Sequence, residues 1–88
     1  MSERMVNTDI KAIIRGYILE QFLPGEKPEA LSDQTELIAT GILDSLASLR
    51  LVSFLEERFG VAFKPHEVDV DHLGTVDRIV EVVTAKQG

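Results

Sequence analysis

Apolar residues recur at the spacing of an α-helix in three separate stretches of this chain, at about residues 8–22, 44–60 and from 75 onward. The β-branched run in the last stretch is also compatible with a strand, but no second strand is available to pair with it. A further helical turn is predicted at residues 65–68, where a proline stands at the first position. We therefore expect an all-α fold, a small four-helix bundle with three main helices, one short helix and a long loop between the first two helices.

The first stretch can be capped by Asn7 or Thr8, and a Pro-Gly pair at residues 24–25 ends it. Its predicted core stripe is Ile10, Ile13, Ile14, Tyr17, Ile18 and Phe22. Residues 23–44 lack sustained periodicity, and a loop of that length in a small domain usually has a function. We expect it to be an ordered crossing whose apolar side chains pin it to the core, namely Leu31, Leu37, Ile38, Ile42 and Leu43.

The second stretch is the best specified element of the sequence. It begins at Asp44 or Ser45, and Gly60 is suited to a left-handed C-terminal cap. Its predicted core stripe is Leu46, Leu49, Val52, Leu55 and Phe59, with Leu51 as a further candidate. Ala47, Ser48 and Arg50 are expected outside that stripe. In the last stretch Thr75 is the expected cap, and the predicted inward residues are Val76, Ile79, Val80 and Val83.

Composition restricts the function. Eighty-eight residues make one domain, here residues 1–88 with an ordered core at about 8–86. The net charge of -6 argues against a nucleic-acid partner, and the absence of cysteine excludes disulfides and thiolate metal sites. We predict no metal site. No apolar run approaches the length of a membrane span, so a cytoplasmic protein without membrane insertion is expected.

Ser45 is the main candidate functional residue. Asp44 alone can cap the helix, which leaves the Ser45 hydroxyl free at the helix's positive end, where backbone N–H groups favour a phosphate. A serine at a helix start is also an ordinary capping residue, so the residues alone leave both interpretations open. Catalysis by this chain is not expected, because the Gly-x-Ser-x-Gly pattern of a hydrolase nucleophile is missing.

The order of these elements resembles the acyl/peptidyl carrier protein family. The resemblance rests on Gly41-Ile42-Leu43-Asp44-Ser45-Leu46, on the helix that ends in Glu56-Glu57-Arg58-Phe59-Gly60-Val61, and on the segment Leu73-Gly74-Thr75-Val76-Asp77-Arg78-Ile79-Val80. It implies that Ser45 carries a 4'-phosphopantetheine from coenzyme A, with a thiol that holds cargo as a thioester. Asp44 would cap the helix and help to present the serine.

The resemblance also implies a stand-alone carrier rather than an enzyme, expected as a monomer. Its partners would be a phosphopantetheinyl transferase, an acyl or amino acid ligase, and downstream acyl-transfer or synthase enzymes of fatty acid or secondary metabolite biosynthesis. The expected docking surface lies near the start of the second helix, at Leu46, Ala47, Leu49 and Arg50. Leu46 is equally compatible with a core position.

The sequence departs from the carriers of fatty acid synthesis. Both Ile42 and Leu43 stand between Gly41 and the Asp-Ser pair, one residue more than those carriers usually have, and the segment 44–60 has a net charge of only -1. Enzymes that require an acidic recognition helix should therefore bind it poorly. Two alternatives stay open, an aminoacyl carrier loaded by a dedicated amino acid ligase and an unmodified acidic helical adaptor.

Overall fold

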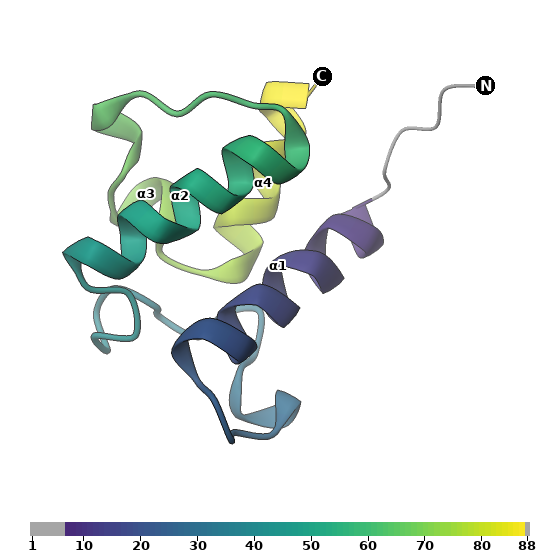
Figure 1. Cartoon of the computed structure of the whole chain (residues 1–88), viewed down its shortest axis with the longest axis vertical. Helices are drawn as coiled ribbons and strands as arrows, with labels where there is room; N and C mark the ends of the chain where they lie inside the picture. The colour runs from purple at the N-terminus through teal and green to yellow at the C-terminus, as the bar shows by residue number, and fades with distance from the viewer. Residues whose placement is uncertain (1–6, 88) are drawn as a thin grey trace.

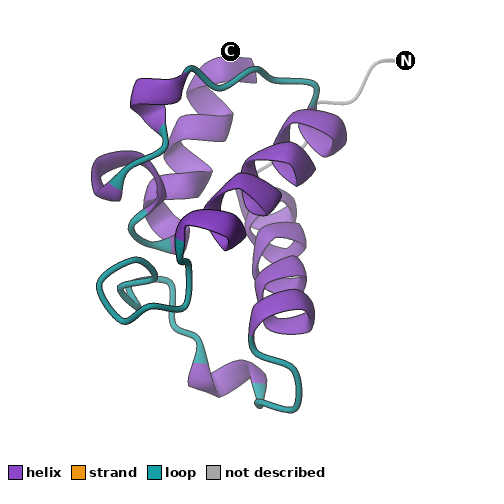
Figure 2. Ribbon diagram, turned by 60° about the vertical axis from the view of Figure 1, so that its left-hand side comes forward, coloured by secondary structure: helices purple, strands orange, loops and turns teal. Residues whose placement is uncertain are grey.

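Four α-helices make up most of the computed structural model, which describes residues 7–87 (Figure 1). They are α1 (Asn7–Phe22), α2 (Ser45–Phe59), α3 (Val70–Leu73) and α4 (Val76–Gln87), with 3₁₀ turns at Pro28–Ala30 and Pro65–Glu67. No strand occurs within this described range (Figure 2). The predicted all-α fold with four helices is confirmed. None of these helices has the length and apolar character to span a membrane.

The short helix does not lie where the sequence placed it. The predicted turn at 65–68 is the 3₁₀ turn Pro65–Glu67, and the short α-helix follows it as α3. Asp69 begins α3, because its carboxylate accepts a hydrogen bond from the His72 backbone N–H at 3.0 Å. This cap provides a partner for a helix-start N–H and starts the helix after the turn rather than within it.

Helix α4 packs against each of the other three helices, so it forms the centre of the bundle. Three fully buried isoleucines of α1 face it, at positions 10, 14 and 18, while Ile13, Tyr17 and Phe22 of the predicted stripe are half-buried. The predicted inward residues of α4 are all buried, namely Val76, Ile79, Val80 and Val83. The proposed cap at Asn7 or Thr8 rests on side chains outside the described part of the structure.

The core face of α2 differs from the predicted one. Leu46 and Leu49 are 66% and 58% exposed, whereas Ala47 and Ser48, expected outside the stripe, are buried. The full buried set of α2 is Ala47, Ser48, Leu51, Val52, Leu55 and Phe59. The helix has more apolar positions than one face can bury, and small residues at 47 and 48 allow its start to approach the core closely.

Apolar side chains of the loop between α1 and α2 pack against the core, as predicted. Leu31, Leu37 and Leu43 are at most 2% exposed. The backbone N–H of Leu37 donates to the carbonyl of Gly74 at 2.7 Å, and that of Leu43 donates to the Leu37 carbonyl at 2.9 Å. These two bonds tie the end of the loop, immediately before α2, to the junction between α3 and α4.

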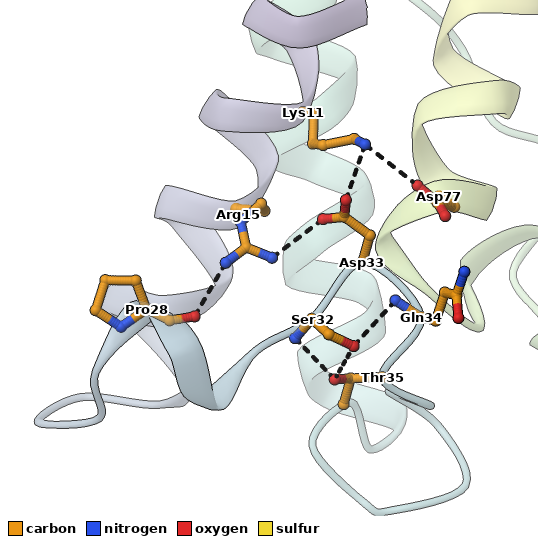
Figure 3. A network of polar contacts seen from close by, with 8 residues as sticks. All are labelled: Lys11, Arg15, Pro28, Ser32, Asp33, Gln34, Thr35 and Asp77. Carbon is orange, nitrogen blue, oxygen red and sulfur yellow. Dashed lines mark hydrogen bonds and ion pairs between the residues drawn. The ribbon is translucent and has the colours of Figure 1, made fainter.

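Asp33 connects this loop to two helices (Figure 3). Its carboxylate accepts from Lys11 Nζ at 2.9 Å and from Arg15 at 3.1 Å, both on α1. Its backbone carbonyl accepts from the Asp77 N–H at the start of α4 at 3.1 Å, and the Asp77 carboxylate lies 3.5 Å from Lys11 Nζ. The hydrogen bond from Lys11, with the nearby charge of Arg15, holds the pKa of Asp33 below its ordinary value.

Glu67 anchors the segment between α2 and α3 in a similar way. Its carboxylate accepts from the Lys64 backbone N–H and from Lys86 Nζ on α4, both at 2.8 Å. These two contacts lower the pKa of Glu67 to about 2. The approach to α3 is thereby fixed to the last turn of α4.

We expect Gly74→Ala to destabilise the protein by about 1–3 kcal/mol. A Cβ at this position would overlap the carbonyl oxygen of Val70, a backbone atom that cannot move away cheaply. Gly16→Ala is a matched control, since a Cβ there meets nothing within 4 Å on α1. That change should stabilise the protein by about 0.5–1 kcal/mol, and urea unfolding followed by circular dichroism measures both variants. Equal effects at the two glycines would contradict this account of Gly74.

We expect Asp33→Asn to lower the free energy of unfolding at pH 7 by about 1 kcal/mol or less, because the ion pairs are partly screened by solvent. A lowered carboxylate pKa adds stability that is present above the ordinary value of 3.8 and is lost as pH falls through the folded-state pKa. The difference between variant and wild type should therefore shrink at pH 2–3 in urea unfolding. Glu81→Gln removes the same charge from an exposed site and should show no such pH-dependent difference.

Candidate functional site

Asp44 is the N-cap of α2. Its backbone is extended, with φ -80° and ψ -173°, and its side chain accepts a hydrogen bond from the Ala47 N–H at 2.8 Å. Its backbone carbonyl accepts the first helical bond, from the Ser48 N–H at 2.8 Å. The predicted capping role of Asp44 is confirmed. At the other end, Gly60 takes the left-handed conformation at φ 66°, also as predicted.

Ser45 is the first residue of α2 and is exposed. The cap comes from Asp44, so the Ser45 hydroxyl is not needed to complete the helix start. Within residues 7–87 this hydroxyl takes part in no hydrogen bond. The hydroxyl is therefore accessible from solvent, and it lies next to the free N–H groups at the positive end of the helix.

An open hollow of about 470 Å³ adjoins Ser45. The start of α2 forms one wall, through Ser45, Ser48 and Leu49, and the segment 68–70 leading into α3 forms the opposite wall. The remaining lining residues are Ile38, Leu43 and Asp44. The surface is mostly apolar with carboxylates and hydroxyls near its edge, so a long molecule with both apolar and polar parts fits it.

Asp69 sets the position of the α3 wall. Besides capping α3, its carboxylate lies 2.7 Å from the His72 Nδ1, which donates to it in the tautomer that carries the proton there. The His72 side chain is the main cause that holds the pKa of Asp69 below its ordinary value. Asp69 is therefore charged at neutral pH and fixes the helical turn on which Val70 stands.

The structure brings some of the predicted site residues together and separates others. Asp44, Ser45 and Leu49 line the same hollow. Leu46 is exposed beside them and is not a core residue, and Arg50 is exposed on the side of α2 that faces α1. The prediction that Ala47 belongs to the docking surface is wrong. Ala47 is 8% exposed and packs into the core, so a partner has little access to its side chain.

Sequence reasoning missed Val70. This residue is 58% exposed and lies across the hollow from Leu49, so it adds an apolar group to the surface around Ser45. The available signal was Asp69, a residue type favoured at N-caps, which would have started the short helix at Val70. Among the described residues no group of histidine and acidic side chains is arranged to hold a metal ion.

Comparison with known families identifies the class of protein. The family model described as phosphopantetheine attachment site matches residues 19–83, about three quarters of the chain and all of the site. The chain belongs to the phosphopantetheine-bearing carrier proteins. Members of this family carry covalent 4'-phosphopantetheine and act as shuttles while partner enzymes do the chemistry, so this carrier is not an enzyme.

Curated relatives agree with the family. A probable acyl carrier protein, PigG of Serratia sp. (strain ATCC 39006), is 37% identical over 67 residues, which cover 76% of each chain. The D-alanyl carrier protein of Streptococcus sanguinis (strain SK36) is 36% identical over 78 residues, covering 86% of this carrier and 92% of the relative.

Two solved structures share the fold. A chain in a crystal structure titled for an FAD-dependent dehydrogenase aligns with a TM-score of 0.72 at 27% identity, covering 80% of this carrier and 97% of that chain. The matched chain is thus no longer than this carrier. The apo form of KstB-PCP aligns with a TM-score of 0.68 at 24% identity, covering 91% and 88% of the two chains.

The residues present around Ser45 fit a phosphopantetheine group. The serine hydroxyl is exposed and has no partner within the described residues, its helix end favours a phosphate, and the adjoining hollow has room along its apolar floor for an extended arm.

We expect Asp44→Ala to lower the free energy of unfolding by about 1 kcal/mol, because the helix loses the acceptor for the Ala47 N–H. Asp44→Asn keeps a side-chain acceptor and should restore most of that loss. Thermal and urea unfolding of the two variants at neutral pH provide the measurement. Equal stability of Asp44→Ala and wild type would show that the cap contributes nothing.

Proposed function

We propose that Ser45 is the residue to which 4'-phosphopantetheine is attached, and that this single-domain carrier presents an acyl or aminoacyl group to partner enzymes. The observation that supports this most directly is the exposed, unbonded Ser45 hydroxyl beside an N-cap already supplied by Asp44. The group supplies a thiol on a long arm, on which cargo is held as a thioester. The protein needs no thiol of its own, in keeping with its lack of cysteine.

The proposed docking surface follows from exposure. Leu46, Leu49 and Val70 are the large apolar side chains that stand out from the described surface, and all three lie near Ser45. Burying such groups supplies most of the affinity at protein interfaces, and a nearby free charge adds selectivity. Arg50 is the charged group next to Leu49 on α2. This surface keeps three of the four residues that the sequence indicated and replaces Ala47 by Val70.

Partner enzymes in this proposal work on the carried group in sequence. A phosphopantetheinyl transferase attaches the arm, an acyl or amino acid ligase loads it, and acyl-transfer or synthase enzymes consume the product. The FAD-dependent dehydrogenase named for one matched structure adds a flavin oxidoreductase as a candidate class of downstream enzyme. Tethering raises the effective concentration of cargo at each active site. The carrier acts as a monomer in the cytoplasm in this proposal.

An aminoacyl cargo is the second candidate. Helix α2 carries Arg50 where an acidic recognition helix would have acids, and the relatives from Streptococcus are named D-alanyl carrier proteins. Both observations favour an amino acid loaded by a dedicated ligase over a fatty acyl chain.

The attachment is tested by incubating the protein with coenzyme A and a broad-specificity phosphopantetheinyl transferase. Wild type should gain the mass of one phosphopantetheine, and Ser45→Ala should gain none. Ser53→Ala removes another exposed hydroxyl of α2 and is the matched control that should be modified normally. No gain on wild type would favour the unmodified adaptor, and an equal gain on Ser45→Ala would show that the group is attached to another residue. Offering the modified protein to fatty acyl and amino acid ligases in parallel then resolves the cargo by thioester formation.

Asp44→Asn separates the two roles of Asp44. The amide keeps the helix cap, so a slower modification at unchanged stability would show that the carboxylate also helps to present Ser45 to the transferase. An unchanged rate would limit Asp44 to capping.

A further inference from the structure

A second hollow, of about 420 Å³, lies between α1 and α2, on the other side of α2 from the one that adjoins Ser45. It is lined by Tyr17, Leu49, Arg50, Ser53, Phe54 and Glu57. Leu49 lines both hollows, so the two form one continuous surface across the exposed side of α2. The attachment of the arm does not use this second hollow.

The floor of this α1–α2 hollow is a pair of stacked aromatic rings. Tyr17 of α1 and Phe54 of α2 lie 3.9 Å apart between centroids at an angle of 13°. The Tyr17 hydroxyl donates to the Arg50 carbonyl at 3.4 Å, and Phe22 meets the Tyr17 ring edge-on at 5.7 Å. These contacts hold the rings in place before any partner arrives, which lowers the entropy lost on binding.

The rim of the hollow carries two opposite charges without partners. Arg50 and Glu57 are exposed and seven residues apart on one face of α2, and neither forms an ion pair within residues 7–87. Ser53 stands between them as a small residue, which is why the hollow is open there. Seven residues correspond to about 10 Å along the helix, too far for the two side chains to neutralise each other strongly.

We propose that this hollow receives an amphipathic helix of a partner enzyme, with an apolar side chain on the Tyr17–Phe54 stack, a carboxylate against Arg50 and a cation against Glu57. The inference rests on the proposed function, since the partner is an enzyme that acts on the group carried at Ser45. Charge complementarity selects this occupant: an apolar floor between a free cation and a free anion matches a segment with the opposite pattern. Because Leu49 lines both hollows, a segment docked here also reaches the surface around Ser45.

A second copy of this chain fits less well. An antiparallel pairing that set Arg50 against the other copy's Glu57 would place one hollow over the other. The space above both aromatic floors would then stay unfilled. The convex apolar group that the hollow requires is then missing.

The test uses stapled model helices of about 15 residues that share one leucine face and differ only in two flanking charges, Glu and Lys, Glu and Glu, or Lys and Lys. Binding to ¹⁵N-labelled holo protein is followed by nuclear magnetic resonance. Wild type should prefer the mixed helix by about threefold or more, with the largest shifts at Tyr17 and Phe54. Arg50→Glu should transfer the preference to the Lys–Lys helix, and Glu57→Lys to the Glu–Glu helix.

Position 53 provides the matched pair of variants. Ser53→Leu fills the hollow from an exposed site and should weaken binding of all three helices by about tenfold or more, while Ser53→Ala should leave it unchanged. Equal affinities for the three helices, shifts confined to Leu46 and Val70, or normal binding by Ser53→Leu would overturn the proposal. Sedimentation of wild type gives one further outcome: self-association abolished by Ser53→Leu would assign the hollow to a second copy.

Repeating the titration with Ser45→Ala separates this proposal from the attachment itself. That variant has no site for the arm, yet its hollow is unchanged, so the same preferences are expected. Attachment that fails while the helices bind normally would overturn the proposed function alone. Normal attachment with no charge preference would overturn the hollow alone.

Discussion

Burial of three leucines in the long loop is the constraint on which the rest of this structure depends. A chain of 88 residues has a small core, and Leu31, Leu37 and Leu43 of the loop are among its largest fully buried side chains. Each buried leucine contributes about 2 kcal/mol of apolar transfer energy, which offsets part of the entropy lost when the loop is ordered. The loop is therefore part of the folded core. Ser45 follows the loop directly, so its position is fixed by the same packing.

Two backbone hydrogen bonds fix the position of this buried loop relative to the helices. Leu37 is joined to Gly74 at the turn between α3 and α4, and Leu43 is joined to Leu37 just before α2 begins. The start of α2 and the short helix α3 are thus held to one another through the loop, and the hollow beside Ser45 lies between them. Asp33 and Glu67 add ion pairs at two further points, but these half-buried pairs are partly screened by solvent and contribute less than the buried leucines.

Helix α2 packs into the core on one face and exposes apolar side chains on the other, where we propose that partners dock. Its inner face packs small residues near its start and larger ones later, while Leu46 and Leu49 remain outside. Exposing two leucines costs solubility, and such patches in small proteins usually mark interaction sites. Two charges of opposite sign, on Arg50 and Glu57, follow on the same helix, and their side chains form no ion pair within the described residues.

Much of this molecule follows from the sequence alone. Helical periodicity placed α1, α2 and α4, the local chemistry of Asp44 and Gly60 set the ends of α2, and the apolar residues of the loop predicted its attachment to the core. Ser45 became the candidate for attachment in the same way, because a cap and the residue after it are local features. These signals depend on neighbours along the chain, which the sequence contains in full.

Only the tertiary structure decided which face of α2 is buried. Leu46 and Leu49 are as apolar as the residues of the core, and periodicity cannot distinguish an exposed leucine from one packed in the core. It also decided that Ala47 is inaccessible, that Val70 faces the hollow, and that Tyr17 of α1 stacks on Phe54 of α2. Each of these depends on how closely two elements approach, and that distance is set by the packing of the whole core.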